Sequence, residues 1–369
     1  MKKLLLILTI SLSLLLTGCI PTEVVEPVDN SMTEEEITAL INELIPEATV
    51  NTTYDLTSFQ TAVTNMIEVA RYGVIGIVNT TDSGAASGSG VIYKQVGDVY
   101  YVVTNSHVVE DSTFLTIVYE KNGILFDIED EHIELLGLDP TTDLAVLTFE
   151  SPEYFSVIPF ADSYDIKVGQ FVFALGNPLG FEYYGTVTMG IVSGLTRYVV
   201  DGGFNTTLLQ HDAAISPGNS GGALLNVNGE LIGINNMKII DDYVTGIGFA
   251  IPSNTVRRIT ADLEDDGIVT RPYLGITTYA QLNVCGTEYG VCVDVQEGGA
   301  AEAAGLQNGD TIVAYKNSSY DEFRAILNFN DLKEAILNSQ VGEEIQLQYI
   351  RDGELYTSDV ATLGIHPDD

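Results

Sequence analysis

The chain has 369 residues, of which 45% are hydrophobic, so it is long enough for two domains with real cores and is not a disordered chain. The 52 acidic residues against 15 basic ones give a formal net charge of -37, and we therefore expect no nucleic acid as a partner, because nucleic acid is held mainly by Lys and Arg. Three cysteines are too few for a disulfide-dense small protein.

The first 18 residues have the pattern of an export signal. Met1-Lys2-Lys3 precedes an apolar run that ends at Leu16 and is too short for a stable spanning helix. The run leads into Leu16-Thr17-Gly18-Cys19, which resembles a bacterial lipobox. That resemblance implies cleavage before Cys19, lipidation of its thiol, and an extracytoplasmic protein anchored to the bacterial cell membrane. An ordinary signal peptide with an incidental cysteine is the alternative.

Residues 19–70 are expected to form an acidic tether followed by a helical segment. Pro21 and Pro27 favour an extended chain. Ser31-Met32-Thr33-Glu34 fits a capping box and opens a short helical pattern that ends at Pro46. A second apolar stripe predicts a helix over Leu56 to Ala70. We interpret both stripes as packing faces.

From Tyr72 onward, short β-branched runs alternate with Gly and Asn turns. This texture predicts a strand-rich domain of sandwich or barrel type. The predicted strands are Val74–Val78, Gly90–Tyr93, Tyr100–Thr104, Phe114–Tyr119, Leu144–Phe149, Phe171–Leu175, Gly190–Ser193, Leu231–Ile234 and Gly248–Ile251.

Three segments in this region carry residues suited to nucleophilic catalysis. His107 follows a predicted strand, Asp143 precedes an apolar strand, and Ser220 lies in a glycine-rich turn. A serine hydroxyl needs a base to remove its proton, and the base needs a buried acid to orient it. Glycines around the serine allow backbone N–H groups to face a developing oxyanion. The chain order His, Asp, Ser is that of the chymotrypsin arrangement.

These segments together resemble the HtrA/Deg proteases. The resemblance implies a mostly β fold in which two six-stranded trypsin-like β-barrels, residues 71–265, hold the active site in their cleft. It implies that His107 is the general base and acid, that Asp143 orients it, and that Ser220 is the nucleophile. The N–H groups of Gly218 and Ser220 would form the oxyanion hole. The matching segments are Thr104–Val109, Asp143–Leu147, Ala174–Gly180, Gly190–Ser193, Gly218–Gly222 and Gly246–Pro252.

The same resemblance places a specificity pocket beside the nucleophile. We expect Ile215, Ile234 and Asn235 to line it, and the lack of an acid at its base favours small or medium apolar P1 residues. His211 stands where the family usually has Thr, and we interpret it as a wall residue near this pocket rather than a second catalytic group. Arg197 is either a sensor-loop arginine or an exposed, solvated one.

Residues 270–364 resemble an HtrA-type PDZ domain with an α+β fold. A helix over Asn254 to Asp266 precedes it, ending at Gly267. Asp331–Leu337 is predicted as the groove-lining helix and Ile345–Arg351 as a closing strand. The resemblance implies that a peptide C-terminus adds to the sheet as a strand while N–H groups of a loop hold its carboxylate. That loop consists of Tyr273, Leu274, Gly275 and Ile276.

A PDZ fold used only for packing is the alternative for this domain. Cys285 and Cys292 flank a predicted hairpin turn. An extracytoplasmic location permits a disulfide between them, and two free buried thiols are the other reading.

The sequence therefore predicts a serine endopeptidase that cleaves misfolded or exported proteins outside the cytoplasm and is regulated by peptides at its PDZ domain. By resemblance we expect a homotrimer or a higher oligomer. No His, Cys and acid spacing suggests a metal site, and we expect no cofactor. The alternative function is a chaperone or scaffold that binds unfolded chains with little proteolysis.

Overall fold

The computed structural model describes residues 55–178, 181–201, 204–236, 246–278, 287, 289–318 and 320–366. The predicted signal peptide, the lipidation of Cys19 and most of the tether lie outside these residues. The described part begins with α2 (Leu56–Ala70), which has the bounds that the sequence predicts. Val63, Met66 and Ile67 pack one face of α2 against a hydrophobic core, and the short turn η1 (Arg71–Gly73) leads from the helix into the first strand.

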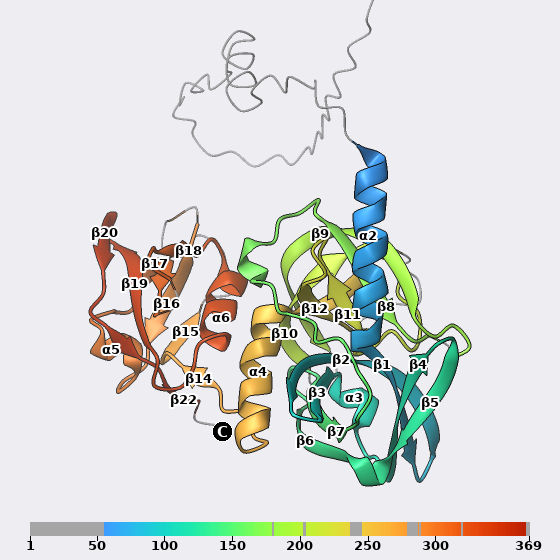
Figure 1. The fold of residues 1–369 in the computed structure, drawn as a ribbon. Coiled ribbons are helices and arrows are strands. Elements are labelled where there is room, and N and C mark those ends of the chain that lie inside the picture. The colour runs from blue at the N-terminus through green and yellow to red at the C-terminus, as the bar shows by residue number, and fades with distance from the viewer. Residues whose placement is uncertain are drawn as a thin grey trace, which may run out of the picture. The chain divides into compact units, whose positions relative to one another are not determined.

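The first half of the β region is a seven-stranded antiparallel sheet, drawn in cyan and green in Figure 1, with the strand order β5-β4-β1-β2-β3-β7-β6. The expectation of a six-stranded barrel is wrong by one strand here. Asn122 and Gly123 both have positive φ, 54° and 78°, so the chain turns back tightly after β4 and adds β5. The strands are β1 (Val74–Thr81), β2 (Gly84–Val96), β3 (Val99–Thr104), β4 (Phe114–Lys121), β5 (Ile124–Glu129), β6 (Ile133–Asp139) and β7 (Leu144–Glu150).

The second half is a closed six-stranded barrel with the order β10-β13-β12-β11-β8-β9, as expected. One hydrophobic cluster, here called the shared core, spans the two halves, because Val103 and Leu144 of the first pack with Leu175 and Leu225 of the second. The strands are β8 (Phe171–Gly176), β9 (Thr186–Asp201), β10 (Phe204–His211), β11 (Ala223–Leu225), β12 (Leu231–Asn236) and β13 (Gly248–Pro252).

Short helical elements connect or close these sheets. The one-turn α3 (Ser106–Val109) follows β3, and η2 (Asp130–His132) and η3 (Ser163–Asp165) lie in loops. The helix α4 (Ser253–Asp265), predicted over Asn254 to Asp266, buries Val256, Ile259 and Leu263 in the shared core. None of the described helices is both long and apolar enough to cross a bilayer.

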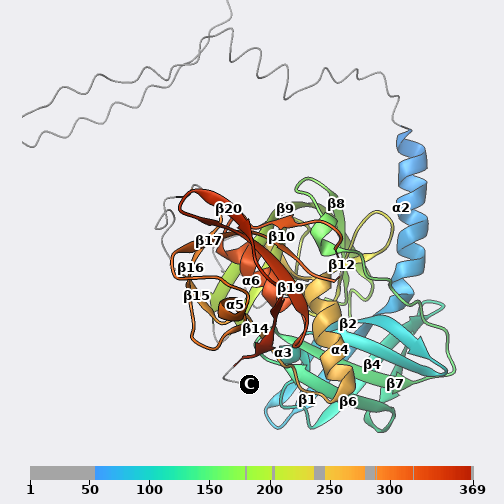
Figure 2. The same cartoon turned by 90° about the vertical axis from the view of Figure 1, so that its left-hand side faces the viewer.

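The C-terminal domain has a separate core and its own sheet, with the order β15-β16-β17-β19-β20. Its elements form the orange and red group in Figures 1 and 2. Among the described strands, β15 is at the edge of the sheet and pairs with β16 alone. The elements are β14 (Pro272–Tyr273), β15 (Ile276–Thr278), β16 (Val291–Val295), α5 (Ala300–Ala303), β17 (Asp310–Lys316), β18 (Arg324–Ala325), α6 (Phe329–Leu337), β19 (Glu344–Arg351), β20 (Glu354–Thr357), β21 (Ala361–Thr362) and β22 (Gly364–Ile365).

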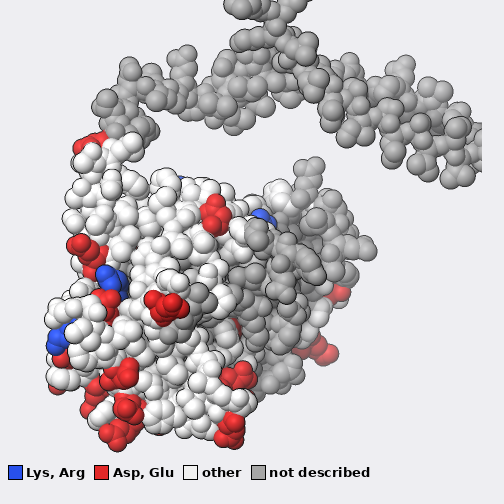
Figure 3. Space-filling view, turned by 90° about the vertical axis from the view of Figure 1, so that its right-hand side faces the viewer, with Lys and Arg blue, Asp and Glu red and all other residues white. Residues whose placement is uncertain are grey.

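The acidic composition is visible on the molecular surface. On the face drawn in Figure 3, acidic side chains recur across the described surface while basic ones are few. One of the three cysteines is covalently engaged in the described part, because Cys292 is disulfide-bonded. Cys285 lies outside the described residues.

An aromatic cluster fills the interior of the first sheet. Phe149 stacks on Tyr100 with ring centroids 5.3 Å apart and meets Phe155 edge-on at 5.2 Å. We expect Phe149→Ala to lower the free energy of unfolding by about 3–5 kcal/mol, because it removes buried contacts and leaves a cavity. Urea unfolding followed by circular dichroism measures this, since the chain has no Trp.

Phe114→Ala is the matched control for Phe149→Ala. The Phe114 side chain is 38% exposed, so its removal should cost about 1 kcal/mol or less. Equal losses in the two variants would contradict the assignment of the aromatic cluster as a core.

Candidate active site

The site is organised around Asp143, which lies in the turn between β6 and β7. Asp139 holds this turn, because its carboxylate accepts hydrogen bonds from the Thr142 N–H at 3.2 Å and the Thr142 hydroxyl at 2.6 Å. Asp143 itself has a φ of 60°, in the left-handed region that residues with a side chain seldom occupy. The Asn105 amide donates to the Asp143 carbonyl at 2.9 Å and helps to keep this conformation.

The Asp143 carboxylate is fully buried and accepts four hydrogen bonds. Its Oδ1 receives the Ser106 hydroxyl at 2.8 Å and the His107 backbone N–H at 3.0 Å. Its Oδ2 receives His107 Nδ1 at 2.7 Å and Asn236 Nδ2 at 2.8 Å. Burial disfavours ionisation, but hydrogen bonds from His107 and Ser106 outweigh burial and lower the pKa of Asp143 below its usual value. The carboxylate is therefore ionised at neutral pH.

His107 and Ser220 face one cavity of about 440 Å³. The cavity is lined by Ala86, Ser87, His107, Val108, Pro217, Gly218 and Ser220. Within the described residues, Ser220 Oγ forms no hydrogen bond with His107. The Ser220 hydroxyl and the His107 imidazole thus line the same open cavity, and hydrogen bonds between such groups are often absent until a ligand binds.

The turn that carries Ser220 is shaped by glycines. Gly218 has a φ of 102°, and a Cβ there would lie 2.5 Å from the Asn177 carbonyl oxygen. A Cβ at Gly221 would collide with the Ser89 carbonyl oxygen. Only glycine therefore allows the turn to lie this close to neighbouring main chain.

Two backbone N–H groups of this turn are free to bind a ligand. The N–H groups of Asn219, Gly221 and Gly222 donate to Ser216, Asn235 and Asn219. Over the same described stretch, the N–H groups of Gly218 and Ser220 have no hydrogen-bond partner. Unpaired donors that flank a nucleophile are the arrangement required to stabilise a tetrahedral oxyanion.

Ser89 in β2 supports this turn, and sequence reasoning missed it. Its hydroxyl donates to the Gly218 carbonyl at 2.7 Å and accepts the Asn177 N–H at 2.8 Å. The Thr104 hydroxyl donates to the Ser89 carbonyl at 2.6 Å. One signal was present in the sequence, because Gly88-Ser89-Gly90 within a strand indicates close approach of another main chain.

Comparison with known proteins identifies two domains in this chain. Residues 88–234 match the family model of a trypsin-like peptidase domain, and residues 272–362 match that of a PDZ domain. The chain is 36% identical over 336 residues to the serine protease Do-like HtrA of Bacillus subtilis, an alignment that covers 81% of this chain and 72% of that relative. The chain belongs to the HtrA family of serine proteases.

Other HtrA proteins give the same result. The periplasmic serine endoprotease DegP of Escherichia coli is 38% identical, with 73% of this chain and 55% of that protein covered. A solved structure, the HtrA-type protease AlgW with a tripeptide, superimposes with a TM-score of 0.59 at 28% identity and covers 83% of this chain and 97% of AlgW. This HtrA-family chain is a serine endopeptidase with a trypsin-like domain and a PDZ domain.

The residues expected to form the specificity pocket do not line the described cavity at Ser220. Ile234 is buried in the shared core, and Ile215 packs beside a second cluster inside the barrel. Asn235 is buried and donates to the Ala223 carbonyl at 2.8 Å. Successive residues of a strand face opposite sides, so it is Asn236 that points toward Asp143. Most of the loop between Asn235 and Gly246 lies outside the described residues.

Of two further residues considered from the sequence, His211 is buried and Arg197 is exposed. His211 is fully buried on β10, and a Cβ added to Gly248 would lie 2.5 Å from its ring. Neither ring nitrogen has a hydrogen-bond partner among the described residues. His211 does not line the cavity at Ser220. Arg197 is exposed and donates through Nε to Gln210 Oε1 at 3.0 Å.

The carboxylate loop expected in the PDZ domain lies between β14 and β15. Gly275 has a φ of 77°, and a Cβ there would lie 2.6 Å from the Gly299 Cα. The carbonyl of Leu274 accepts the Ala301 N–H at 2.8 Å, and that of Gly275 accepts the Gln296 N–H at 2.9 Å. In the described part of this domain, the N–H groups of Leu274 and Gly275 have no partner, so this HtrA loop presents two free donors.

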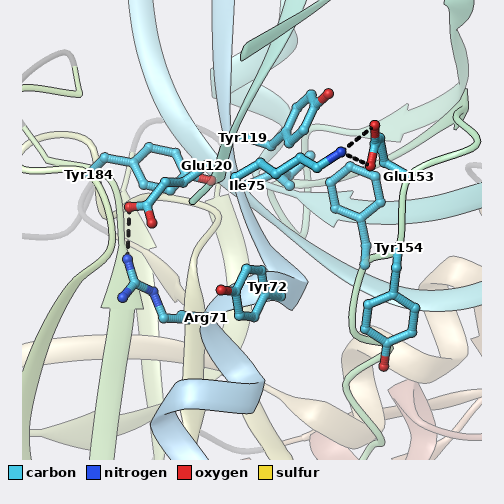
Figure 4. A pocket seen from close by; sticks show the side chains of 10 residues that line it. Arg71, Tyr72, Ile75, Tyr119, Glu120, Glu153, Tyr154 and Tyr184 are labelled. Atoms are coloured by element: carbon cyan, nitrogen blue, oxygen red, sulfur yellow. Dashed lines mark hydrogen bonds and ion pairs between the residues drawn. The ribbon is translucent and has the colours of Figure 1, made fainter. Parts of the chain in front are cut away.

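A second pocket, of about 140 Å³, lies apart from the catalytic residues and is drawn in Figure 4. Its carboxylates are already paired: Glu120 with Arg71 at 2.8 Å and Glu153 with Lys121 at 2.7 Å. Figure 4 shows these two ion pairs at opposite ends of the pocket, with Tyr72 between them. Because both carboxylates are neutralised by these ion pairs, we interpret the pocket as a structural contact that holds η1 against β4.

The burial of His211 predicts a pH-dependent stability of the HtrA fold. Burial lowers the pKa of His211 from 6.5 to about 4. As the pH falls, the unfolded chain therefore binds this proton before the folded chain does. Neutral His211 makes its full contribution to the free energy of unfolding above about pH 6.5. That contribution, at most about 3 kcal/mol, is lost as the pH falls from there to about 4.

His211→Leu should flatten this part of the stability profile. Urea midpoints measured at neutral pH and at about pH 5 should differ less in the variant than in the unaltered chain. His132→Leu, which removes a solvent-exposed histidine, is the matched control. An unchanged pH dependence in His211→Leu would show that His211 does not carry the effect.

Proposed function

We propose that this HtrA-family endopeptidase cleaves peptide bonds with His107, Asp143 and Ser220 as a catalytic triad. The observation that carries the proposal is the 2.7 Å hydrogen bond between His107 Nδ1 and the buried Asp143, with the other side of the imidazole in the cavity that Ser220 lines. This bond fixes the tautomer that leaves His107 Nε2 free to accept a proton.

The chemistry follows from these positions. Ser220 Oγ attacks the substrate carbonyl carbon while His107 Nε2 takes the hydroxyl proton, and the anionic Asp143 stabilises the resulting imidazolium. The tetrahedral oxyanion accepts hydrogen bonds from the unpaired N–H groups of Gly218 and Ser220. Collapse of this intermediate releases the amine, which receives the proton from His107, and leaves an acyl-enzyme. Water activated by His107 then hydrolyses the ester.

We further propose that the substrates are misfolded or exported proteins outside the cytoplasm. The export-signal pattern of residues 1–18 and the relative named a periplasmic serine endoprotease support this location. Lipidation of Cys19, membrane anchoring and a homotrimer or higher oligomer remain part of the proposal. The proposed domain limits are 1–18, 19–70, 71–265 and 270–364, and the two family matches fall within the last two.

The PDZ domain is proposed to bind peptide C-termini through Tyr273, Leu274, Gly275 and Ile276. The free N–H groups of Leu274 and Gly275 can donate hydrogen bonds to a carboxylate, and the open edge of β15 can pair with an added strand. For the protease domain we keep Ile215 as a wall of the specificity pocket, since it directly precedes the turn of Ser216 to Gly218.

Ser220→Ala should lower casein cleavage by at least about a thousandfold, because the nucleophile is lost. A fluorophosphonate probe should label the unaltered chain and not this variant. Ser83→Ala, in the exposed turn between β1 and β2, is the matched control and should keep both activities. Equal casein cleavage by Ser220→Ala would refute the triad, and failure to label the unaltered chain would favour the chaperone or scaffold alternative.

Gly275→Ala should weaken binding of a peptide with a free C-terminus by tenfold or more. The added Cβ both strains a positive φ and meets the Gly299 main chain, which displaces the carboxylate loop. Fluorescence anisotropy of a labelled peptide measures this, with the C-terminally amidated peptide as the ligand control. Gly353→Ala has a similar φ of 81° and open space around its Cβ, so it should bind normally. Normal binding by Gly275→Ala would contradict the assigned loop.

A further inference from the structure

Two side chains outside the proposed triad donate to the catalytic carboxylate, one to each oxygen. The Ser106 hydroxyl lies 2.8 Å from Oδ1 of Asp143, and Asn236 Nδ2 lies 2.8 Å from Oδ2. Ser106 and Asn236 are 3% and 0% exposed, so water does not compete for these bonds. An ionised carboxylate only accepts hydrogen bonds, and the direction of both bonds is therefore fixed.

These donors come from different parts of the fold. Ser106 is the first residue of α3, next to His107 in the first sheet, whereas Asn236 is the last residue of β12 in the closed barrel. On Oδ2, the Asn236 amide and His107 Nδ1 share a single oxygen atom. The negative charge of Asp143, which would stabilise a protonated His107, is thus also shared with the Ser106 and Asn236 donors.

We propose that Ser106 and Asn236 are positioning residues that set the proton affinity of His107 through the carboxylate of Asp143. The inference rests on the proposed triad and deepens it. Each hydrogen bond that Asp143 accepts from Ser106 or Asn236 stabilises its negative charge and makes the carboxylate a weaker partner for an imidazolium. The two donors therefore keep His107 unprotonated, and so competent as a base, to a lower pH than the His107–Asp143 pair alone would.

The competing explanation is that both residues only hold Asp143 in its left-handed conformation. The two explanations differ in what they predict for a pH profile. The acidic limb of the profile is the range in which the rate falls as the pH is lowered and the base becomes protonated. A purely structural role lowers the reaction rate at every pH and leaves the position of this acidic limb unchanged. A role through the carboxylate moves that limb to higher pH when a donor is removed, because the base becomes protonated more readily.

The experiment measures the second-order rate of fluorophosphonate labelling of Ser220 in the full chain, across the acidic and neutral pH range. This reaction reports the free enzyme and needs no peptide substrate. Ser106→Ala and Asn236→Ala should each shift the acidic limb upward by about 0.3–1 pH unit, a fraction of the roughly 1–2 units that one hydrogen bond to a charged group is worth, because the effect reaches His107 only through Asp143. Ser106→Thr, which keeps the hydroxyl, should return the limb toward its original position.

Asn105→Ala is the matched control for Asn236→Ala. It also removes an amide that donates to Asp143, but at the backbone carbonyl rather than the carboxylate. The labelling rate of Asn105→Ala can fall, but the acidic limb of its pH profile should stay in place. Asn236→Leu, which has about the size of Asn but no donor, provides a second variant if Asn236→Ala does not fold.

The outcomes separate this inference from the proposed function. An acidic limb that stays in place in both Ser106→Ala and Asn236→Ala would overturn the inference and leave the triad intact. A limb that moves equally in Asn105→Ala would also overturn it, because the effect would then follow from the conformation of Asp143. Absence of Ser220 labelling in the unaltered chain would overturn the triad, and the inference with it.

Discussion

The buried charge of Asp143 is the constraint on which the rest of the structure depends. An ionised carboxylate away from water is costly unless hydrogen bonds replace its hydration. Here the replacement donors come from α3 and from the end of β12, so the charge is tolerated only when the first sheet and the closed barrel are docked. The local requirement of one buried charge thereby becomes a condition on the arrangement of both halves.

The shared core holds the same two halves together through apolar contacts. Residues of β3, β7, β8 and β11 pack in one cluster, and α4 covers it with a buried face. At the edge of this core, glycines let the turn of Ser220 approach the main chain of Asn177 and Ser89 more closely than any side chain would allow. Apolar burial provides the stability, whereas the close main-chain contacts provide the geometry of the site.

Much of this could be read from the sequence because the relevant signals are local. The apolar stripe of α2 gave its bounds, and the glycines around Ser220 marked a tight turn. The rest depends on contacts between distant residues. Ser89 meets Gly218 across 129 positions, and Asn236 meets Asp143 across 93. Sequence reasoning expected Asn235 to line the specificity pocket and did not consider Asn236, whose side chain leaves the opposite face of β12 and reaches Asp143. The extra strand β5 escaped notice because its outward face is apolar and its alternation is weak.

The bond from the Ser89 hydroxyl to the Gly218 carbonyl joins the two halves at the turn that carries Ser220. If heat or denaturant begins to part the halves, this contact breaks and the Gly218 peptide is free to rotate. Proteolysis should then cease while most of the secondary structure is still present. We therefore expect this protease to lose activity early in its own unfolding, which would limit digestion of one partly opened molecule by another.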